Sequence, residues 1–446
     1  MQLGKIVPKN LAGFMELLPA KQIIFDSIVN IMKEVYSKHG FYSLDTPTLE
    51  YSSVLLAKAG GETEKQIYRF SKGATDMTMR FDLTVPLAKY VSMNYNELIF
   101  PFKRYQIGKV FRGEKAQKGR YREFYQADID VIGDGSLSTI NDAEITSIIY
   151  EIFKELGLYD FTIRINNRKI LSGFFNILSL SDKCNDIMRV IDKIEKVGIE
   201  KAKDELMLLA LSSTQINEIM DFVCIKGTTE EIIDKSNLYL NKDTDFDTGI
   251  AEIKEVLYYI DVFGVPKKNY TLDYSIARGL DYYTGTVYET TVNDFPKLGS
   301  VCSGGRYDNL AEYFTNRKLP GVGISIGINR LFDALQAMDN DIFMRNSPID
   351  ILLIPMNVEI FEKAICVSRD FQDAGIKTQI YFEDVKLAKK MKYANKINVP
   401  FVVILGENEI SENKITIKRM EDGQSSMITL SEAVGIVKSY KRTVLY

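Results

Sequence analysis

Residues 321–328 place glycine or serine at every second position, with an apolar residue between. The small residues are Gly321, Gly323, Ser325 and Gly327, and the apolar ones are Val322, Ile324, Ile326 and Ile328. Because side chains alternate between the two faces of a strand, one face is apolar and buried, and the other is nearly bare backbone. A flat ligand such as adenine can lie on that bare face.

Two common nucleotide-binding motifs do not fit this chain. Residues 321–330 miss the G-x-G-x-x-G pattern by one residue, which disfavours a dinucleotide fold. Gly108 and Gly113 have the spacing of a P-loop, but Glu114 follows where lysine is required. A nucleotide site in this chain is therefore expected on antiparallel strands.

A single histidine, His39, excludes several kinds of catalysis. A Ser-His-Asp hydrolase, an H-E-x-x-H protease and a multi-histidine metal site all need imidazoles that the chain lacks. Catalysis must therefore depend on Arg, Lys, Asp, Glu, Tyr or a cofactor. His39 itself ends an amphipathic helix outside every candidate site, so we predict a structural or surface role for it.

Length, charge and cysteine spacing indicate a reduced, multidomain protein. The 446 residues suggest about two to four domains. The four cysteines lie far apart and predict neither a zinc knuckle nor a disulfide framework. Without a signal segment or an apolar run of about 18 residues, a cytoplasmic protein with no membrane association is expected. A net charge of −4 argues against indiscriminate coating of nucleic acid, but local basic patches remain.

The densest charge lies between residues 103 and 122. Eight of these twenty residues are basic: Lys103, Arg104, Lys109, Arg112, Lys115, Lys118, Arg120 and Arg122. The pattern predicts an antiparallel hairpin whose second strand carries on one face Arg120, Arg122, Phe124, Gln126, Asp128 and Asp130. Such a face can meet phosphate, base and an amine together; a solvated hairpin is the alternative.

Three further segments carry weaker signals. Read as a strand, residues 80–84 place Arg80, Asp82 and Thr84 on one face, which suits an ammonium group; an ordinary surface strand is the alternative. Residues 278–285 lie between strands expected at 270–276 and 286–292, and Arg278 offers a forked donor to phosphate or carboxylate. The alternative for this segment is a hairpin tip. Residues 304–307, Gly-Gly-Arg-Tyr, are ambiguous alone.

The periodicity along the chain divides it into several regions. Helices are expected at 19–38, from Pro86 onward and at 141–156, and a short strand at 41–50 is broken at Pro47. Residues 182–264 contain amphipathic helical stretches, such as 187–197 and 229–240, and suggest an inserted helical domain. From Pro348, strands at 348–355, 377–382 and 400–405 alternate with helices at 358–374 and 385–397, which predicts a small α/β domain with parallel strands.

Together these segments resemble the class II aminoacyl-tRNA synthetases, and within them the histidyl-tRNA synthetase family. Residues 111–114 (FRGE) with 120–124 (RYREF) resemble motif 2, 321–330 resemble motif 3, and 40–51 resemble the dimer-forming motif 1. Residues 278–283 (RGLDYY) resemble the histidine-specific motif, with 304–308 (GGRYD) as its companion. Asn329 departs from the acidic residue often found before the motif 3 arginine.

The resemblance implies an enzyme that activates L-histidine with ATP and Mg²⁺ and transfers it to tRNA(His). It implies ATP contacts from Arg112, Glu114, Phe124 and Arg330, with Arg112 and Arg278 as catalytic groups at the α-phosphate. It implies histidine contacts from Asp82, Thr84, Gln126, Asp130, Arg278, Tyr282, Tyr283 and Tyr307. No protein metal ligands are implied with certainty.

The implied fold is α+β: an antiparallel sheet with flanking helices, a helical insertion and a C-terminal α/β anticodon-binding domain. The expected boundaries are 1–181 and 266–345 for the two parts of the catalytic domain, 182–265 for the insertion and 346–446 for the last domain. A homodimer is implied by motif 1. Five lysines around one helix of the last domain would contact tRNA: Lys386, Lys389, Lys390, Lys392 and Lys396.

Two other functions share much of this pattern. A synthetase-like regulatory subunit of ATP phosphoribosyltransferase has the same fold without catalysis, but it lacks the anticodon domain and degrades the histidine motif. A class II synthetase for threonine, proline or glycine shares the last domain but not residues 278–283.

Overall fold

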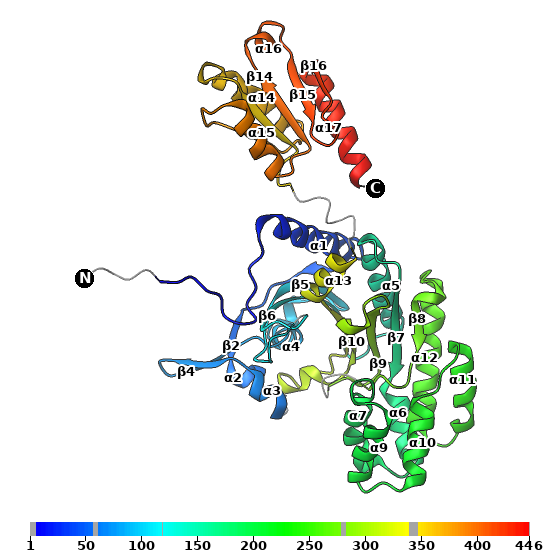
Figure 1. The fold of residues 1–446 in the computed structure, drawn as a ribbon. Helices are drawn as coiled ribbons and strands as arrows, with labels where there is room; N and C mark the ends of the chain where they lie inside the picture. Colours follow the sequence, from blue (N-terminus) through cyan, green and yellow to red (C-terminus); the bar gives the residue numbers. More distant parts are fainter. Residues whose placement is uncertain (1–5, 57–60, 118, 278–281, 339–346, 446) are drawn as a thin grey trace. The chain divides into compact units, whose positions relative to one another are not determined.

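The computed structural model describes residues 6–56, 61–117, 119–277, 282–338 and 347–445 (Figure 1). The chain forms two compact units, Met1–Glu16 with Ile28–Asn340, and Leu17–Ser27 with Asp341–Tyr446. None of the described helices combines the length and the apolar character that a bilayer span requires.

The first unit is built on an eight-stranded sheet in the order β1-β5-β6-β11-β10-β9-β7-β8. Its strands are β1 Tyr42–Ser43, β5 Phe102–Phe111, β6 Glu123–Ile132, β7 Phe161–Asn167, β8 Tyr270–Leu272, β9 Thr286–Val292, β10 Ser300–Tyr307 and β11 Gly321–Gly327. The six strands from β5 to β7 pair antiparallel, and β1 and β8 add in parallel at the two edges. The predicted antiparallel hairpin is confirmed as β5–β6.

The register joins the two sequence patterns that alternate with period two. On β6, Gln126 lies opposite Gly327 of β11, Asp128 opposite Ser325, and Asp130 opposite Gly323. A Cβ atom at Gly323 would lie 2.2 Å from Asp130 Oδ1, so this position has room for glycine only. The bare face of β11 therefore continues the polar face of β6, as the alternation predicted.

The opposite face of the sheet is apolar along β11 and is covered by helices, and it also holds a buried ion pair. The helix predicted at 19–38 is confirmed as α1 Pro19–Lys38, and its Tyr36 hydroxyl donates to the carbonyl of Ala127 on β6 at 3.4 Å. Helix α5, Ile140–Glu155, covers the same face, where its Asp142 binds Arg306 of β10 at 2.5 Å. His39 bonds Glu151 of α5 at 2.8 Å, a contact that agrees with the structural or surface role predicted for it.

The strand expected at residues 80–84 is wrong. A small sheet of β2 Leu49–Tyr51, β3 Arg69–Lys72 and β4 Thr75–Met79 ends before Arg80, and helix α4, Thr84–Met93, begins two residues before Pro86. Asp82 causes this early start, because its Oδ1 accepts the backbone N–H of Val85 at 3.0 Å in the first turn of the helix. Arg80 instead donates to the carbonyls of Lys109 at 2.7 Å and Thr46 at 2.5 Å.

The strand expected at 270–276 ends at Leu272, and the hairpin tip considered for residues 278–285 is also wrong. β8 and β9 do not pair with each other, because each pairs with a different side of β7. The chain between them therefore crosses from one side of β7 to the other. Arg278 and its neighbours up to residue 281 lie outside the described residues.

The helical segment after residue 182 belongs to the first unit. It contains α7 Cys184–Ile191, α8 Ile194–Val197, α9 Ile199–Leu208, α10 Ser213–Val223, α11 Thr229–Ser236 and α12 Thr244–Val262, so the helix expected over 187–197 is interrupted. Helix α12 packs on α6, Arg168–Ile177. A Cβ at Gly173 would lie 2.2 Å from the backbone N of Phe246, so glycine allows the two helices to approach at backbone distance.

The second unit contains a five-stranded sheet in the order β13-β12-β14-β15-β16. Its strands are β12 Ile351–Pro355, β13 Thr378–Ile380, β14 Phe401–Leu405, β15 Ile415–Arg419 and β16 Ser425–Ile428, and its main helices are α14 Phe361–Asp373, α15 Leu387–Lys396 and α17 Leu430–Leu445. The predicted parallel pairing is confirmed for β12 with β13 and β14. The antiparallel strands β15 and β16 extend the sheet beyond the predicted alternation.

Candidate active site

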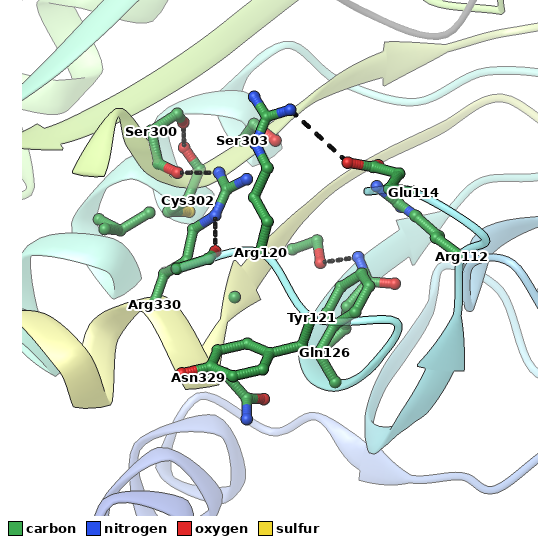
Figure 2. A pocket seen from close by; sticks show the side chains of 15 residues that line it. Arg112, Glu114, Arg120, Tyr121, Gln126, Ser300, Cys302, Ser303, Asn329 and Arg330 are labelled. Carbon is green, nitrogen blue, oxygen red and sulfur yellow. Dashed lines mark hydrogen bonds and ion pairs between the residues drawn. The ribbon is translucent and has the colours of Figure 1, made fainter. Parts of the chain in front are cut away.

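A cavity of about 250 Å³ opens over the bare face of β11, between the β5–β6 hairpin and the start of helix α13, Ile328–Ala337 (Figure 2). It is lined by Arg112, Glu114, Gly119, Arg120, Tyr121, Phe124, Gln126, Ser300, Val301, Cys302, Ser303, Ser325, Gly327, Asn329 and Arg330. All four residues predicted to contact ATP are among them: Arg112, Glu114, Phe124 and Arg330.

Arg112 is held between two aromatic rings at the end of β5. Its guanidinium carbon lies 4.4 Å from the centroid of Phe81 and 5.2 Å from that of Phe124, and its Nε donates to the carbonyl of Phe81 at 3.2 Å. Burial lowers the pKa of Arg112, and the charge of Asp82 opposes that shift. An arginine remains a cation through such a shift, so the cavity presents a fixed, weakly hydrated positive charge.

Arg330 and Glu114 are oriented by contacts at the cavity wall (Figure 2). Arg330 donates to the carbonyls of Gly119 at 2.9 Å and Ser300 at 2.8 Å. Glu114 pairs with Arg120 at 3.6 Å, and both side chains are partly exposed to solvent. An anion and three cations therefore surround one opening, which suits a ligand that carries both phosphates and N–H donors.

Asn329 has a role that the sequence did not suggest. Its Oδ1 accepts the backbone N–H of Tyr125 on β6 at 2.7 Å, and thereby joins the start of α13 to the hairpin. The neighbouring Tyr121 donates to Asp333 of the same helix at 3.1 Å, and burial raises the pKa of Tyr121 to about 12. The amide thus supplies an acceptor where the motif often has a carboxylate.

Below the cavity, Asp130 is bound by two buried partners. Its Oδ2 lies 2.7 Å from Arg104, which is fully buried, and its Oδ1 accepts the hydroxyl of Tyr307 at 2.5 Å. Burial raises the pKa of Asp130, while Arg104 opposes the shift. The sequence noted Arg104 only as part of the basic hairpin; its position opposite Asp130 across β5–β6 is the signal that could have identified the pair.

Asp128 is a second buried carboxyl beside the first. Burial, and to a smaller extent the charge of Asp130, raise its pKa to about 7 against the opposing charge of Arg104. Its Oδ1 has no hydrogen-bond partner among the described residues. Asp128 was on the predicted polar face but was not assigned to the site. The even-numbered spacing that selected Gln126 and Asp130 selects Asp128 equally.

The predicted histidine-contacting residues gather around Asp130. The ring of Tyr282 lies 4.7 Å from that of Tyr283 and 6.0 Å from that of Tyr307. Tyr282 also hydrogen-bonds Thr84, and the charge of Asp82 raises the pKa of Tyr282. Burial raises the pKa of all three tyrosines, so they remain neutral phenols that can donate and accept. Of the predicted residues, only Arg278 lies outside the described part of the chain.

Gln126 lies on the face that connects these two groups of residues. It lines the cavity, and its Nε2 donates to Ser325 Oγ at 2.6 Å, as the dashed line in Figure 2 marks. Its Oε1 is buried and has no partner among the described residues. The sequence predicted Gln126 and missed Ser325, which was considered only as part of the small-residue face.

One prediction about the second unit is wrong. Lys390 does not belong to an exposed basic helix, because it is 2% exposed and its Nζ donates to the carbonyl of Pro355 at 2.7 Å. The other lysines of the predicted group, Lys386, Lys389, Lys392 and Lys396, are exposed. The packing of α15 against the end of β12 decides the difference, which the spacing of lysines in the sequence does not show.

Comparison with known proteins gives a consistent assignment. A family model described as histidyl-tRNA synthetase matches residues 13–331, and one described as anticodon binding domain matches residues 350–440. A histidine–tRNA ligase of Clostridium tetani is 54% identical over 443 residues, covering 98% of this chain and all of the relative. One of Finegoldia magna is 46% identical, covering 97% and 100%. A solved histidyl-tRNA synthetase of a Nostoc species superposes with a TM-score of 0.89 at 36% identity, covering 98% of this chain and 100% of the other.

Proposed function

Because the chain belongs to the histidyl-tRNA synthetase family and is a histidine–tRNA ligase, we propose that the cavity over β11 binds ATP and that the cluster around Asp130 binds histidine. The observation that carries the proposal is the continuity of the two places on one sheet face. Gln126, Asp128 and Asp130 follow each other at every second residue of β6, leading from the cavity to the tyrosines. A carboxylate of bound histidine and the α-phosphate of ATP would meet along this line.

In the proposed ATP site, Arg112 binds the α-phosphate and Arg330 covers the base and the terminal phosphates. Phe124 stacks on the adenine, and Glu114 accepts from its exocyclic amine. The bare face of β11 leaves room for the ring, because a Cβ atom added at Gly327 would have only one neighbour within 4 Å, the carbonyl oxygen of Val301 at 3.7 Å. Arg278 is proposed as the second cation at the α-phosphate.

The chemistry of adenylation fits these groups. The substrate carboxylate is already an anion, so it attacks the α-phosphorus without a general base. The site must align the two reactants and neutralise charge in the transition state. Arg112 supplies that charge at a fixed position, since its guanidinium is clamped between two rings.

In the proposed histidine site, Asp130 and the tyrosines bind the imidazole. Tyr283 and Tyr307 lie beside Asp130, and Asp82, Thr84 and Gln126 would hold the α-ammonium group. An amino acid without an imidazole would leave buried polar groups unpaired, which costs several kcal/mol and corresponds to a discrimination of about 10⁴-fold. Such a pocket would select histidine without editing.

Mg²⁺ is proposed to enter as part of the substrate, bound to the phosphates of ATP. Within the described residues no three His, Cys, Asp or Glu side chains come together as a metal site. Mg²⁺ generally keeps several waters and binds substrate phosphates with few protein ligands. The ion would neutralise charge on the leaving pyrophosphate.

The domain division predicted from sequence is retained as a proposal. Residues 1–181 and 266–345 would form the catalytic domain, 182–265 the helical insertion and 346–446 the anticodon-binding domain. The exposed lysines of α15 would contact the tRNA backbone, since lysine binds phosphate as a point charge. The transfer step would place histidine on the 3′-terminal adenosine of tRNA(His).

A cytoplasmic homodimer is also proposed. Strand β1 lies at the edge of the eight-stranded sheet, and its Tyr42 is 72% exposed. Tyr51 at the end of β2 is 64% exposed. Apolar side chains beside an open strand edge favour pairing with a second chain. All four cysteines are free, as in reducing compartments.

The decisive experiment is an amino-acid panel in ATP–pyrophosphate exchange. Histidine alone should support exchange well above background, and adding tRNA(His) should yield the aminoacylated product. Exchange with threonine, proline or glycine but not histidine would refute the function. Absence of exchange with every amino acid would favour a non-catalytic regulatory subunit.

A further inference from the structure

The two ends of the Gln126 amide are chemically opposite, and the proposed histidine site needs one of them. An α-ammonium group has only N–H donors, so it can bind the carbonyl Oε1 but not the Nε2 amide group. A half-turn of the amide exchanges the two ends with almost no change in shape. Productive binding therefore requires a group that holds the amide in one orientation.

Ser325 occupies the position needed to hold it. Its Oγ accepts from Gln126 Nε2 at 2.6 Å. Ser325 lies opposite Asp128 in the β6–β11 ladder, one alternation away from the Gln126–Gly327 pair, so its short side chain lies on the same face as both β6 residues. Across this pair of the ladder, Ser325 also lowers the pKa of Asp128, which favours the ionised carboxylate.

The carboxylate gives this series of hydrogen bonds a single direction. When Asp128 is ionised, above its pKa of about 7, it has no proton to donate, so the Ser325 hydroxyl opposite it must act as the donor. The Ser325 oxygen is then left as an acceptor, and only the Nε2 end of Gln126 can satisfy it. Arg104 favours the ionised form of Asp128, while burial and the charges of Asp130 and Asp82 oppose it.

The carbonyl oxygen of the Gln126 amide is therefore left to accept a hydrogen bond from the substrate. Gln126 Oε1 is buried without a hydrogen-bond partner among the described residues, a state that costs free energy until a donor arrives. A cationic ammonium group is the strongest donor that a carbonyl of this kind can receive, and its charge also favours the ionised form of Asp128.

We propose that Ser325 is a positioning residue for histidine: with Asp128 it orients the Gln126 amide so that the carbonyl oxygen meets the α-ammonium group of the substrate. This assignment deepens the proposed function and rests on it. It makes Ser325 and Asp128 determinants of selectivity for an amine on the substrate, although neither needs to touch that amine.

Two imidazole ligands separate this role from a general structural one. L-histidinol keeps the ammonium group and lacks the carboxylate, whereas imidazolepropionate keeps the carboxylate and lacks the ammonium group. Their Kd values are measured by calorimetry on the full chain, alongside the KM for histidine in pyrophosphate exchange. Ser325→Ala should weaken histidinol and histidine by about tenfold or more, the usual effect of a lost charge-assisted hydrogen bond. It should leave the Kd of imidazolepropionate unchanged.

Two further variants complete the design. Ser325→Thr keeps the hydroxyl and should retain histidinol binding. Ser236→Ala is a matched control, because Ser236 is a fully buried hydroxyl bonded to Ile232 at 2.8 Å and Tyr274 at 2.7 Å on elements that do not line the cavity. It should leave the ratio of the two Kd values unaltered. If Ser325→Ala fails to fold, Ser325→Cys keeps the shape and replaces the hydroxyl by a weak acceptor.

Equal weakening of both ligands by Ser325→Ala would overturn the proposal, as would unchanged binding of histidinol. These outcomes differ from failure of the proposed function. In that case the unaltered protein would show no histidine-dependent exchange, whatever the variants do.

Discussion

The two large sheets of this chain differ in the kind of side chain that they bury. In the eight-stranded sheet, neighbouring central strands bury Arg104, Gln106, Asp128 and Asp130 on one face, and each of them is at most 3% exposed. In the five-stranded sheet, all five residues of β12 are buried and none carries a charge. Apolar burial on both faces stabilises a sheet directly, whereas buried charge costs free energy unless each group is paired.

This difference in buried charge coincides with the location of the proposed substrate site. The charged face is the one proposed to bind histidine and ATP, and the cost of desolvating Asp130 is opposed by its contacts with Arg104 and Tyr307. The apolar sheet packs against a core cluster of residues such as Leu353, Phe371 and Val403, and the buried cation of α15, Lys390, is bonded to a carbonyl at the end of β12. Removing one charge should therefore damage the first sheet in a pH-dependent way, and removing one apolar side chain should damage the second without pH dependence.

The largest effect is expected for Arg104→Met. The substitution leaves Asp128 and Asp130 buried without their shared cation, which should cost about 3–5 kcal/mol of unfolding free energy at pH 8. The loss should shrink toward pH 5, because protonated carboxyls no longer need a cation. Denaturant unfolding of the first unit at both pH values measures it, and an equal loss at pH 5 and pH 8 would contradict the explanation.

Asp128→Asn should stabilise the protein at alkaline pH. The folded pKa of Asp128 is raised to about 7 from an ordinary value near 3.8. The folded state therefore binds this proton more tightly than the unfolded state does. The stabilisation that the bound proton provides below pH 4 is lost as the pH rises to 7. At pH 8 the variant should gain stability on the order of 4 kcal/mol as an upper limit, with no gain near pH 4. Melting temperatures of the variant and the parent across this pH range provide the measurement. An equal pH dependence of the two melting temperatures would refute the prediction.

Leu353→Ala tests the apolar sheet. Leu353 is fully buried on β12, so the cavity left behind should cost about 2–4 kcal/mol. No titratable group is removed, and the loss should be the same at pH 5 and pH 8. Pyrophosphate exchange should be preserved while the thermal transition of the second unit moves down. A pH-dependent loss of stability in Leu353→Ala would contradict the proposed difference between the two sheets.

Asp130→Asn should act mainly on histidine affinity. The amide can still accept from Tyr307, but it no longer supplies a negative charge for the imidazole or for Arg104. The KM for histidine in exchange should rise about tenfold to a hundredfold, as expected for a hydrogen bond to a charged group, with little change in the KM for ATP. An unchanged histidine KM would remove Asp130 from the proposed pocket.

The smallest effect is expected for Lys392→Ala on α15. Losing the proposed phosphate contact of this exposed lysine should weaken tRNA(His) binding severalfold at low salt and reduce the salt dependence of log Kd by about one unit. Exchange without tRNA should be unaffected. The matched control is Lys390→Met, which removes a buried ammonium bonded to Pro355 and should alter stability with no change in the salt dependence. Equal salt dependence for Lys392→Ala and the parent would exclude α15 from the tRNA interface.

Much of the fold could be predicted because it depends on local periodicity. Alternation with period two predicted strands β5, β6, β9 and β11, and helical periodicity predicted the bounds of α1. The same rule selected Gln126 and Asp130 for the site. It failed at residues 80–84, where the Asp82 side chain caps a helix and competes with the extended conformation.

Some residues of the site could not be found from spacing. Arg104 becomes important only because β5 pairs with β6 in a register that brings it opposite Asp130, 26 residues later in the chain. Ser325 acquires its role when β11 is placed beside β6, although nearly 200 residues separate Ser325 from Gln126. Lys390 changes from an exposed cation to a buried donor when α15 packs on the sheet of the second unit.

The sequence by itself determined the alternating faces, the excluded chemistries and the motifs that identify the family. These follow from side-chain identity at fixed intervals, which local backbone geometry converts into faces. Only the tertiary structure decided which charges share a partner and how the amide of Gln126 is oriented. Strand register and burial set those relations, since they bring together groups that are distant in the chain and remove the water that would otherwise satisfy them.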